Sequence, residues 1–160
     1  MTRALLTWLL LAFCLATSSV LANDAASLDR IFPRSTLQIA TPDARLHKFD
    51  VWIAHDDARR ARGLMFVRNL GDHEGMLFIY EQAHPVSMWM KNTYVSLDML
   101  FVGADGRVER VVENTEPESL KTIESKAPVL AVVELKAGTA ARLKIRPGAR
   151  VIHGAFASGR

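Results

Sequence analysis

The 160-residue sequence has 20 Lys and Arg residues against 17 Asp and Glu residues, for a formal net charge of +3. A balance this mild does not provide the concentrated basic surface of a nucleic-acid-binding protein, so we expect no nucleic-acid partner. The length suits one hydrophobic core rather than several.

The first 22 residues have the pattern of a secretory signal peptide. Arg3 provides the positive start, an apolar run from Ala4 to Leu15 follows, and Val20-Leu21-Ala22 fits a cleavage site. The run is too short for a membrane-spanning helix. We therefore expect cleavage after Ala22, export to the periplasm or medium, and no stable membrane span afterwards. An uncleaved anchor is the alternative.

Cys14, the one cysteine of the sequence, lies inside this segment. A lipoprotein signal requires a small residue before its cysteine, and Phe13 stands there, so we expect no lipid. Cleavage removes Cys14 and also Arg3, the one charged residue of the segment, which lowers the formal net charge from +3 to +2. Without disulfides, the exported chain depends on its hydrophobic core.

Beyond the signal peptide, the pattern predicts short strands. Residues 23–35 are small and polar and are predicted to be a flexible tether with an anchoring turn, and residues 36–160 a single β-rich domain. Helices are predicted at 56–63, which starts with aspartates and ends at Gly63, and at 139–145. Strands are predicted from alternating or apolar runs at residues 36–40, 47–54, 76–80, 86–91, 97–102, 108–113, 129–135 and 151–153.

These elements indicate a mostly β, single-domain antiparallel β-sandwich or barrel-like fold with two short helices. The run Ala104-Asp105-Gly106-Arg107 predicts a hairpin turn, because Asp-Gly accepts positive φ angles. The polar and acidic residues 114–127 are predicted to be a loop.

Five sequence blocks carry a resemblance to a known family. They are Arg60-Ala61-Arg62-Gly63-Leu64-Met65, Gly75-Met76-Leu77-Phe78, Trp89-Met90-Lys91-Asn92-Thr93, Leu97-Asp98-Met99-Leu100-Phe101 and, more weakly, Val133-Glu134-Leu135-Lys136-Ala137-Gly138. With them, the chain resembles the "domain of unknown function 192" family over residues 36–153. The resemblance implies a compact β fold and, for some members, export. It implies no established reaction, catalytic residue or cofactor. The loop at Glu116-Pro117-Glu118-Ser119 departs from the proline-rich stretch expected there.

The strand predicted around residue 89 suggests a binding site. Alternation places Met88 and Met90 on one face and Trp89 and Lys91 on the other. An indole beside an ammonium group can hold a planar or sugar-like anionic ligand. The structural alternative is that Trp89 covers the end of the sheet and the stem of Lys91 packs along it.

A hairpin from residue 86 to residue 102 would place Asn92 and Asp98 at its mouth and bring Lys91 near Asp98. The helix that ends at Arg62 would pack over the same sheet. We therefore predict one polar cleft with Trp89 as its floor. Its other lining residues would be Arg62, Lys91, Asn92 and Asp98. Arg62 belongs to a basic cluster with Arg59, Arg60 and Arg68, for which a solvated helix face is the alternative.

Asp98 and Glu134 each interrupt an apolar strand, where an unpaired buried carboxylate is costly. Such carboxylates can also perform acid–base chemistry. Three functions therefore stay open. The first is binding of a small polar or anionic ligand, or of an exported protein partner, through the cleft. The second is a periplasmic hydrolase that uses Asp98 or Glu134. The third is a structural or assembly module without a cleft.

No metal or cofactor is expected. The five methionines beyond the signal peptide could bind Cu(I), but they alternate with apolar residues and are predicted to fill the core. Asp72-His73-Glu74 lacks the spacing of a metal motif, and no phosphate loop or dinucleotide fingerprint is present.

Overall fold

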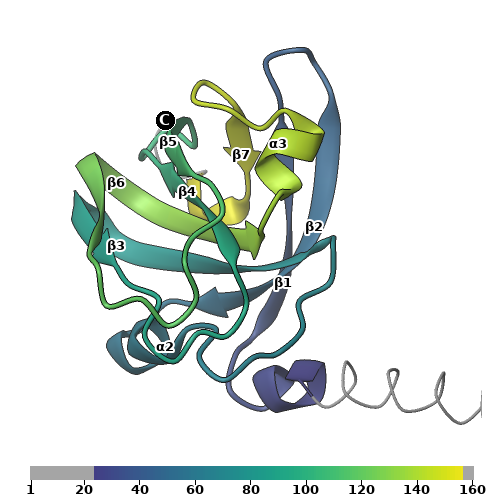
Figure 1. Cartoon of the computed structure of the whole chain (residues 1–160). Coiled ribbons are helices and arrows are strands. Elements are labelled where there is room, and N and C mark those ends of the chain that lie inside the picture. Colours follow the sequence, from purple (N-terminus) through teal and green to yellow (C-terminus); the bar gives the residue numbers. More distant parts are fainter. Residues whose placement is uncertain (1–23, 157–160) are drawn as a thin grey trace, which may run out of the picture.

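The computed structural model describes residues 24–156 (Figure 1). The predicted signal peptide and its cleavage site lie outside these residues. The seven strands are β1 (Arg34–Ala40), β2 (Leu46–Ala54), β3 (Glu74–Met88), β4 (Leu97–Val102), β5 (Val108–Val112), β6 (Ile123–Lys136) and β7 (Arg150–Ile152). The helices are α2 (Asp57–Arg62), α3 (Thr139–Leu143) and the 3-10 turn η1 (Gly154–Phe156), and residues 24–29 are also helical. No helix within residues 24–156 has the length and hydrophobicity to cross a bilayer.

All seven strands belong to one sheet in the order β5-β4-β6-β3-β2-β1-β7. The two edges approach each other, since the N–H of Val108 donates to Ala149 and the N–H of Val151 donates to Gly106, each at 2.8 Å. An isolated bridge joins Arg107 to the β7 edge. The sheet therefore nearly closes into a barrel, which confirms the predicted mostly β, barrel-like fold.

One pair of strands departs from the predicted antiparallel arrangement. Strands β2 and β3 pair in parallel, with Val51 opposite Gly75. Parallel neighbours need a long crossover connection, and the chain between β2 and β3 supplies it with α2 and the loop at residues 63–73.

Strands β3 and β6 form a long bent ribbon across the sheet (Figure 1). Strand β3 unites the strand predicted at 76–80 with residues 86–88 of the strand predicted at 86–91, whose residues 89–91 lie in the following loop. Strand β6 takes in the end of the predicted loop 114–127. Irregular pairing between Ile79 and His84 bends the ribbon. The residues at this bend of β3 are exposed, so their sequence resembles that of a loop.

Strand β6 lies between β3 and β4, so the hairpin predicted from residue 86 to residue 102 was wrong. The end of β3 pairs with β6, with Met88 opposite Ile123. Residues 89–96 are therefore free to form a loop that crosses from β3 to β4.

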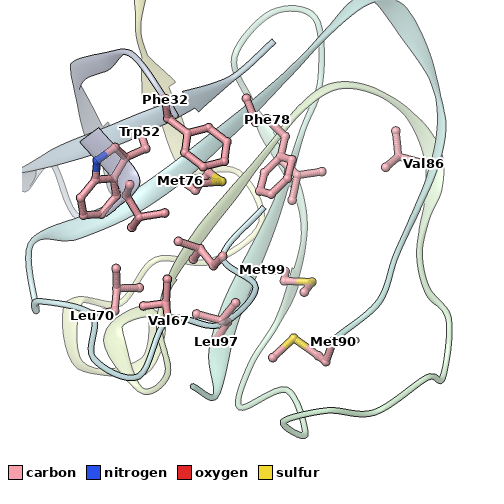
Figure 2. Close-up of a cluster of buried hydrophobic side chains, with 14 of the residues drawn as sticks. Phe32, Trp52, Val67, Leu70, Met76, Phe78, Val86, Met90, Leu97 and Met99 are labelled. Atoms are coloured by element: carbon pink, nitrogen blue, oxygen red, sulfur yellow. The ribbon is translucent and has the colours of Figure 1, made fainter. Parts of the chain in front are cut away.

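The sheet has a hydrophobic cluster on each face. Leu77 points into the barrel, while its neighbours Met76 and Phe78 point outward. The interior cluster includes Leu37, Ile39, Phe49, Val51, Leu100, Val133 and Val151. The outer cluster, shown in Figure 2, includes Phe32, Trp52, Val67, Leu70, Met76, Phe78, Val86, Met90, Leu97 and Met99. The prediction that the methionines fill the core is confirmed for Met76, Met90 and Met99, which are at most 1% exposed.

Residues 24–35 are bound to the barrel, so the flexible tether predicted for residues 23–35 was wrong over this described part. Leu28 and Phe32 are buried in the outer cluster. Asp29 accepts a hydrogen bond of 2.7 Å from the indole N–H of Trp52. The segment is polar overall, but its apolar residues Leu28 and Phe32 are four positions apart and therefore share one side of a short helical turn.

The predicted helix ends of α2 are present. The carboxylate of Asp56 accepts the backbone N–H of Arg59 at 2.8 Å, and the N–H of Gly63 closes the last turn onto the carbonyl of Arg59. Gly63 has a φ of 44°, and a Cβ atom there would lie 3.2 Å from the Phe78 ring. Glycine therefore lets the chain turn tightly over β3.

Candidate functional site

A cavity of about 230 Å³ opens between the end of α2, the outer face of β3 and β6, and the loop that follows β3. We refer to it as the Glu134 pocket. Its lining residues are Arg60, Ala61, Arg62, Gly63, Leu64, Met65, Phe78, Tyr80, Ser87, Met88, Trp89, Lys91, Thr93 and Glu134.

Glu134 is the buried acidic residue of this pocket. It is 4% exposed and lies on β6 between Met76 of β3 and Met99 of β4. Its carboxyl group makes no hydrogen bond or ion pair with any residue from 24 to 156. Burial raises the pKa of Glu134 to about 8, because no neighbouring group offsets the loss of water around the charged form.

Gly75 allows β3 to approach β6 closely beside Glu134. A Cβ atom at Gly75 would lie 2.5 Å from the backbone carbonyl oxygen of Glu134. Real Cβ atoms do not come so close, so a larger residue would push the strands apart at the base of the pocket.

Arg62 contributes an unpaired positive charge. Its guanidinium group donates to the backbone carbonyls of Gly63 and Met65 and lies 5.0 Å from the ring centre of Phe66. It forms no ion pair with a carboxylate in residues 24–156. Partial burial lowers the pKa of Arg62, although an arginine remains charged at neutral pH. Its charge is therefore available to an anion in the pocket.

Lys91 and Trp89 lie together in the loop after β3. The Lys91 ammonium is 5.3 Å from the centre of the Trp89 ring, and Lys91 also has no carboxylate partner among the described residues. Trp89 is 51% exposed, so it lies on the rim and does not form the predicted floor. The buried lining residues are Gly63, Leu64, Phe78, Thr93 and Glu134.

Arg60 and Tyr80 form another wall. Arg60 pairs with Asp57 at 2.6 Å and donates to the carbonyl of Ile79 at 2.8 Å. Its guanidinium lies 5.2 Å from the centre of the Tyr80 ring. Burial raises the pKa of Tyr80 to about 12, so its hydroxyl stays protonated. Tyr80 lies outside the five sequence blocks, although its spacing of two from Phe78 places both residues on one face of β3.

The structure brings Arg62, Trp89 and Lys91 to one pocket but leaves out Asp98 and Asn92, two residues predicted to line it. Asp98 is 0% exposed and accepts backbone N–H groups from Asn114 at 2.9 Å and Ala140 at 2.8 Å. It precedes Met99 by one residue, so the pleat of β4 turns it into the barrel, away from the pocket.

Asn92 contributes through its backbone. It has a φ of 54°, a left-handed conformation that asparagine tolerates better than most residues. Its carbonyl accepts the N–H of Phe66 at 2.8 Å. Asn92 therefore joins the loop after β3 to the loop after α2, and it does not line the pocket.

The rest of the predicted basic cluster is engaged elsewhere. Arg59 pairs with Asp56, the residue that caps α2. Arg68 lies 4.9 Å from the ring centre of Tyr94. Neither arginine lines the Glu134 pocket.

Ser35 and His153 form a second contact that resembles a nucleophile and its base, at 3.0 Å. The N–H of Ala155 donates to Nδ1 of His153, and burial lowers the pKa of His153. The neutral ring therefore carries its proton on Nε2 and donates it to Ser35. In this tautomer His153 cannot accept the serine proton, so the pair lacks the base of a serine hydrolase.

Comparison with solved structures finds close relatives of this fold. A crystal structure from Sinorhizobium meliloti 1021, described as a "putative transcription regulator", is 40% identical with a TM-score of 0.76, and the match covers 78% of this chain and 96% of that one. A protein of unknown function from Novosphingobium aromaticivorans DSM 12444 is 37% identical with a TM-score of 0.72, covering 75% and 85%. No curated protein matches the chain. The family model DUF192, described as "Uncharacterized ACR", matches residues 38–153, and the chain therefore belongs to this family, as its sequence blocks predict.

Proposed function

We propose that this protein is exported and binds a small anionic ligand in the Glu134 pocket. The observation that carries the proposal is the pair of positive charges, Arg62 and Lys91, that line one cavity without a carboxylate partner among the described residues. Arg59 and Arg60, the other arginines of α2, are each paired with an aspartate. A ligand carboxylate or phosphate would complete the missing pairs.

The dimensions and walls of the pocket support a small ligand. A cavity of about 230 Å³ is below the range typical of drug-sized ligands. Phe78 and Tyr80 provide aromatic surface, and Trp89 on the rim can cover a bound group.

Export is proposed from the first 22 residues, with Arg3, the apolar run and Ala22 in the order of a signal peptide. Intact-mass measurement of the protein recovered from the exporting cell tests it. We expect a chain that begins at Asn23. A chain that keeps Met1, or that carries a lipid on Cys14, would contradict the proposal.

Ligand binding is tested by thermal shift and calorimetry with acetate, butyrate, inorganic phosphate and small sugar acids. Arg62→Ala should weaken the binding of any active probe at least tenfold, about 1.4 kcal/mol. Arg68→Ala is the matched control, because Arg68 also stacks on an aromatic ring but lies outside the pocket. Equal losses in the two variants, or no binding of any probe, would refute an anion site at Arg62.

A hydrolase that uses Glu134 is the second candidate. A buried carboxyl group with a raised pKa in a pocket is suited to act as a general acid near neutral pH. Asp98 is unavailable as its partner because it faces the barrel interior. Turnover of small ester or phosphoester substrates that Glu134→Gln abolishes would favour this function over simple binding.

A further inference from the structure

We infer that the ligand of the Glu134 pocket is zwitterionic, with an ammonium group that pairs with Glu134 and an anionic group that pairs with Arg62 and Lys91. This inference rests on the proposed anion binding and adds a second charge to the ligand. It identifies the ligand class as amino acids and related compounds that carry both charges on a short framework.

The base of the pocket lacks a cation. Glu134 is almost fully buried, and its neighbours across the ladder, Met76 and Met99, offer no donor. Its carboxyl oxygens reach solvent only through the pocket, and a carboxylate with so little water and no protein partner is costly in its charged form. An ammonium group that enters the cavity would provide both a counter-charge and hydrogen-bond donors.

The cations of the pocket do not fill this role, because each is held by other groups. Arg62 donates to the carbonyls of Gly63 and Met65, and Lys91 lies over Trp89. Arg60 is paired with Asp57. None of the three forms an ion pair with Glu134. The cavity therefore has two separate charged ends.

The cavity wall also includes apolar side chains, among them Leu64, Met65 and Phe78. Such a wall suits a short hydrocarbon framework that joins two charged groups. A ligand with one charge would satisfy one end and leave the other without a partner. A ligand with two correctly spaced charges pairs with both ends, so the pocket would discriminate a zwitterion from a ligand with a single charge.

The alternative is that Glu134 stays protonated and donates a hydrogen bond to an anion. The two cases differ in proton balance. Because the pKa of free Glu134 is about 8, the group is mostly protonated at pH 7. Pairing with an ammonium group requires its ionised form, so binding a zwitterion releases about one proton. Binding a plain anion to the protonated form releases none.

The experiment compares ligands matched in length by calorimetry at pH 7, in buffers with different ionisation enthalpies. The probes are butyrate, butylamine and the ω-amino acids from glycine to 6-aminohexanoate. We expect one amino acid to bind at least tenfold more tightly than butyrate, with release of about one proton. Glu134→Gln should abolish both effects and retain binding of butyrate. Glu124→Gln makes the same change at an exposed glutamate of β6 outside the pocket and should retain both effects.

Two results separate this inference from the proposed function. If butyrate binds as tightly as every amino acid, or if binding releases no proton, the ligand is not a zwitterion, although anion binding at Arg62 stands. If no probe binds the protein or its variants, the proposed anion site fails, and the zwitterion inference fails with it.

Discussion

Asp98 and Glu134 are buried carboxyl groups on neighbouring strands, yet their surroundings are opposite. Met99, the residue after Asp98, lies directly across the ladder from Glu134. Asp98 faces the barrel interior and accepts two backbone N–H groups. Glu134 faces the outer side and accepts none from residues 24–156. The fold itself completes the Asp98 site, whereas the Glu134 site is complete only with something from outside.

An acidic residue in an apolar strand does not by itself indicate a binding site. An acidic residue in an apolar strand attracts attention because a buried carboxylate is costly. Hydrogen bonds from the fold offset that cost at Asp98, which ties the loop at Asn114 and the start of α3 to β4. A buried acidic residue therefore indicates a binding site only where such donors are missing.

The largest expected effect is that of Asp98→Ala. The change leaves the buried N–H of Ala140 without an acceptor and frees the N–H of Asn114. Hydrogen bonds to a charged group are worth about 1.5–3 kcal/mol each, so we expect a loss of roughly 3–6 kcal/mol in the free energy of unfolding. Urea denaturation measures it.

Asp98→Asn is the informative control because it keeps one oxygen acceptor in a side chain of equal size. It should lose roughly half as much, since its amide N–H₂ meets one backbone N–H. A loss below about 1 kcal/mol in Asp98→Ala would show that Asp98 does not hold this part of the fold.

The next effect concerns the apolar surroundings of Glu134. Met99→Ala should cost about 2–5 kcal/mol, because Met99 is fully buried and its removal leaves a cavity. The half-buried Met88 is the control, and Met88→Ala should cost clearly less. Thermal unfolding of both variants gives the comparison. Equal losses would mean that the outer cluster is not tightly packed around Glu134.

Glu134→Gln should stabilise the ligand-free protein at neutral pH. The folded-state pKa of about 8 lies above the reference value of 4.5, so the native state binds the proton more tightly than the unfolded state. The resulting stabilisation is complete below pH 4.5 and is lost as the pH rises to about 8. At pH 7, Glu134→Gln should be more stable than wild type by roughly 2–4 kcal/mol.

At pH 4 the two proteins should have nearly equal stability, because Glu134 is then protonated in both states. Denaturant titrations at pH 4, 6 and 8 measure this trend. A constant difference across that range would mean that Glu134 is solvated or paired, and the contrast with Asp98 would disappear.

Local sequence patterns predicted the barrel-like fold. They did not predict the order of the strands, which depends on long-range pairing. The alternation of Phe49, Val51 and Ile53 identified β2, and Asp56 with Gly63 identified α2. The position of β6 between β3 and β4 has no local signal, because strand order depends on contacts between distant residues.

The candidate site was only partly predictable, because it too depends on the pairing of distant strands. Arg62, Trp89 and Lys91 lie in two sequence blocks and line one pocket. Glu134 joins them only through the register of β6 with β3, so the sequence identified it as a candidate catalytic group without linking it to the others. Asp98 was assigned to the same cleft because a hairpin was assumed where β6 intervenes.

The smallest effect on stability should come from Lys91→Ala. Lys91 is exposed, has no carboxylate partner among residues 24–156, and contacts the ring of Trp89. An exposed cation–π contact is worth about 0.5–1 kcal/mol, so the free energy of unfolding should fall by at most that amount. The affinity for an anionic probe should nevertheless fall at least tenfold, or about 1.4 kcal/mol. Lys121→Ala, which removes an exposed lysine outside the pocket, should change neither quantity. Greater loss of stability than of binding in Lys91→Ala would make Lys91 a structural residue and leave Arg62 as the one cation of the anion site.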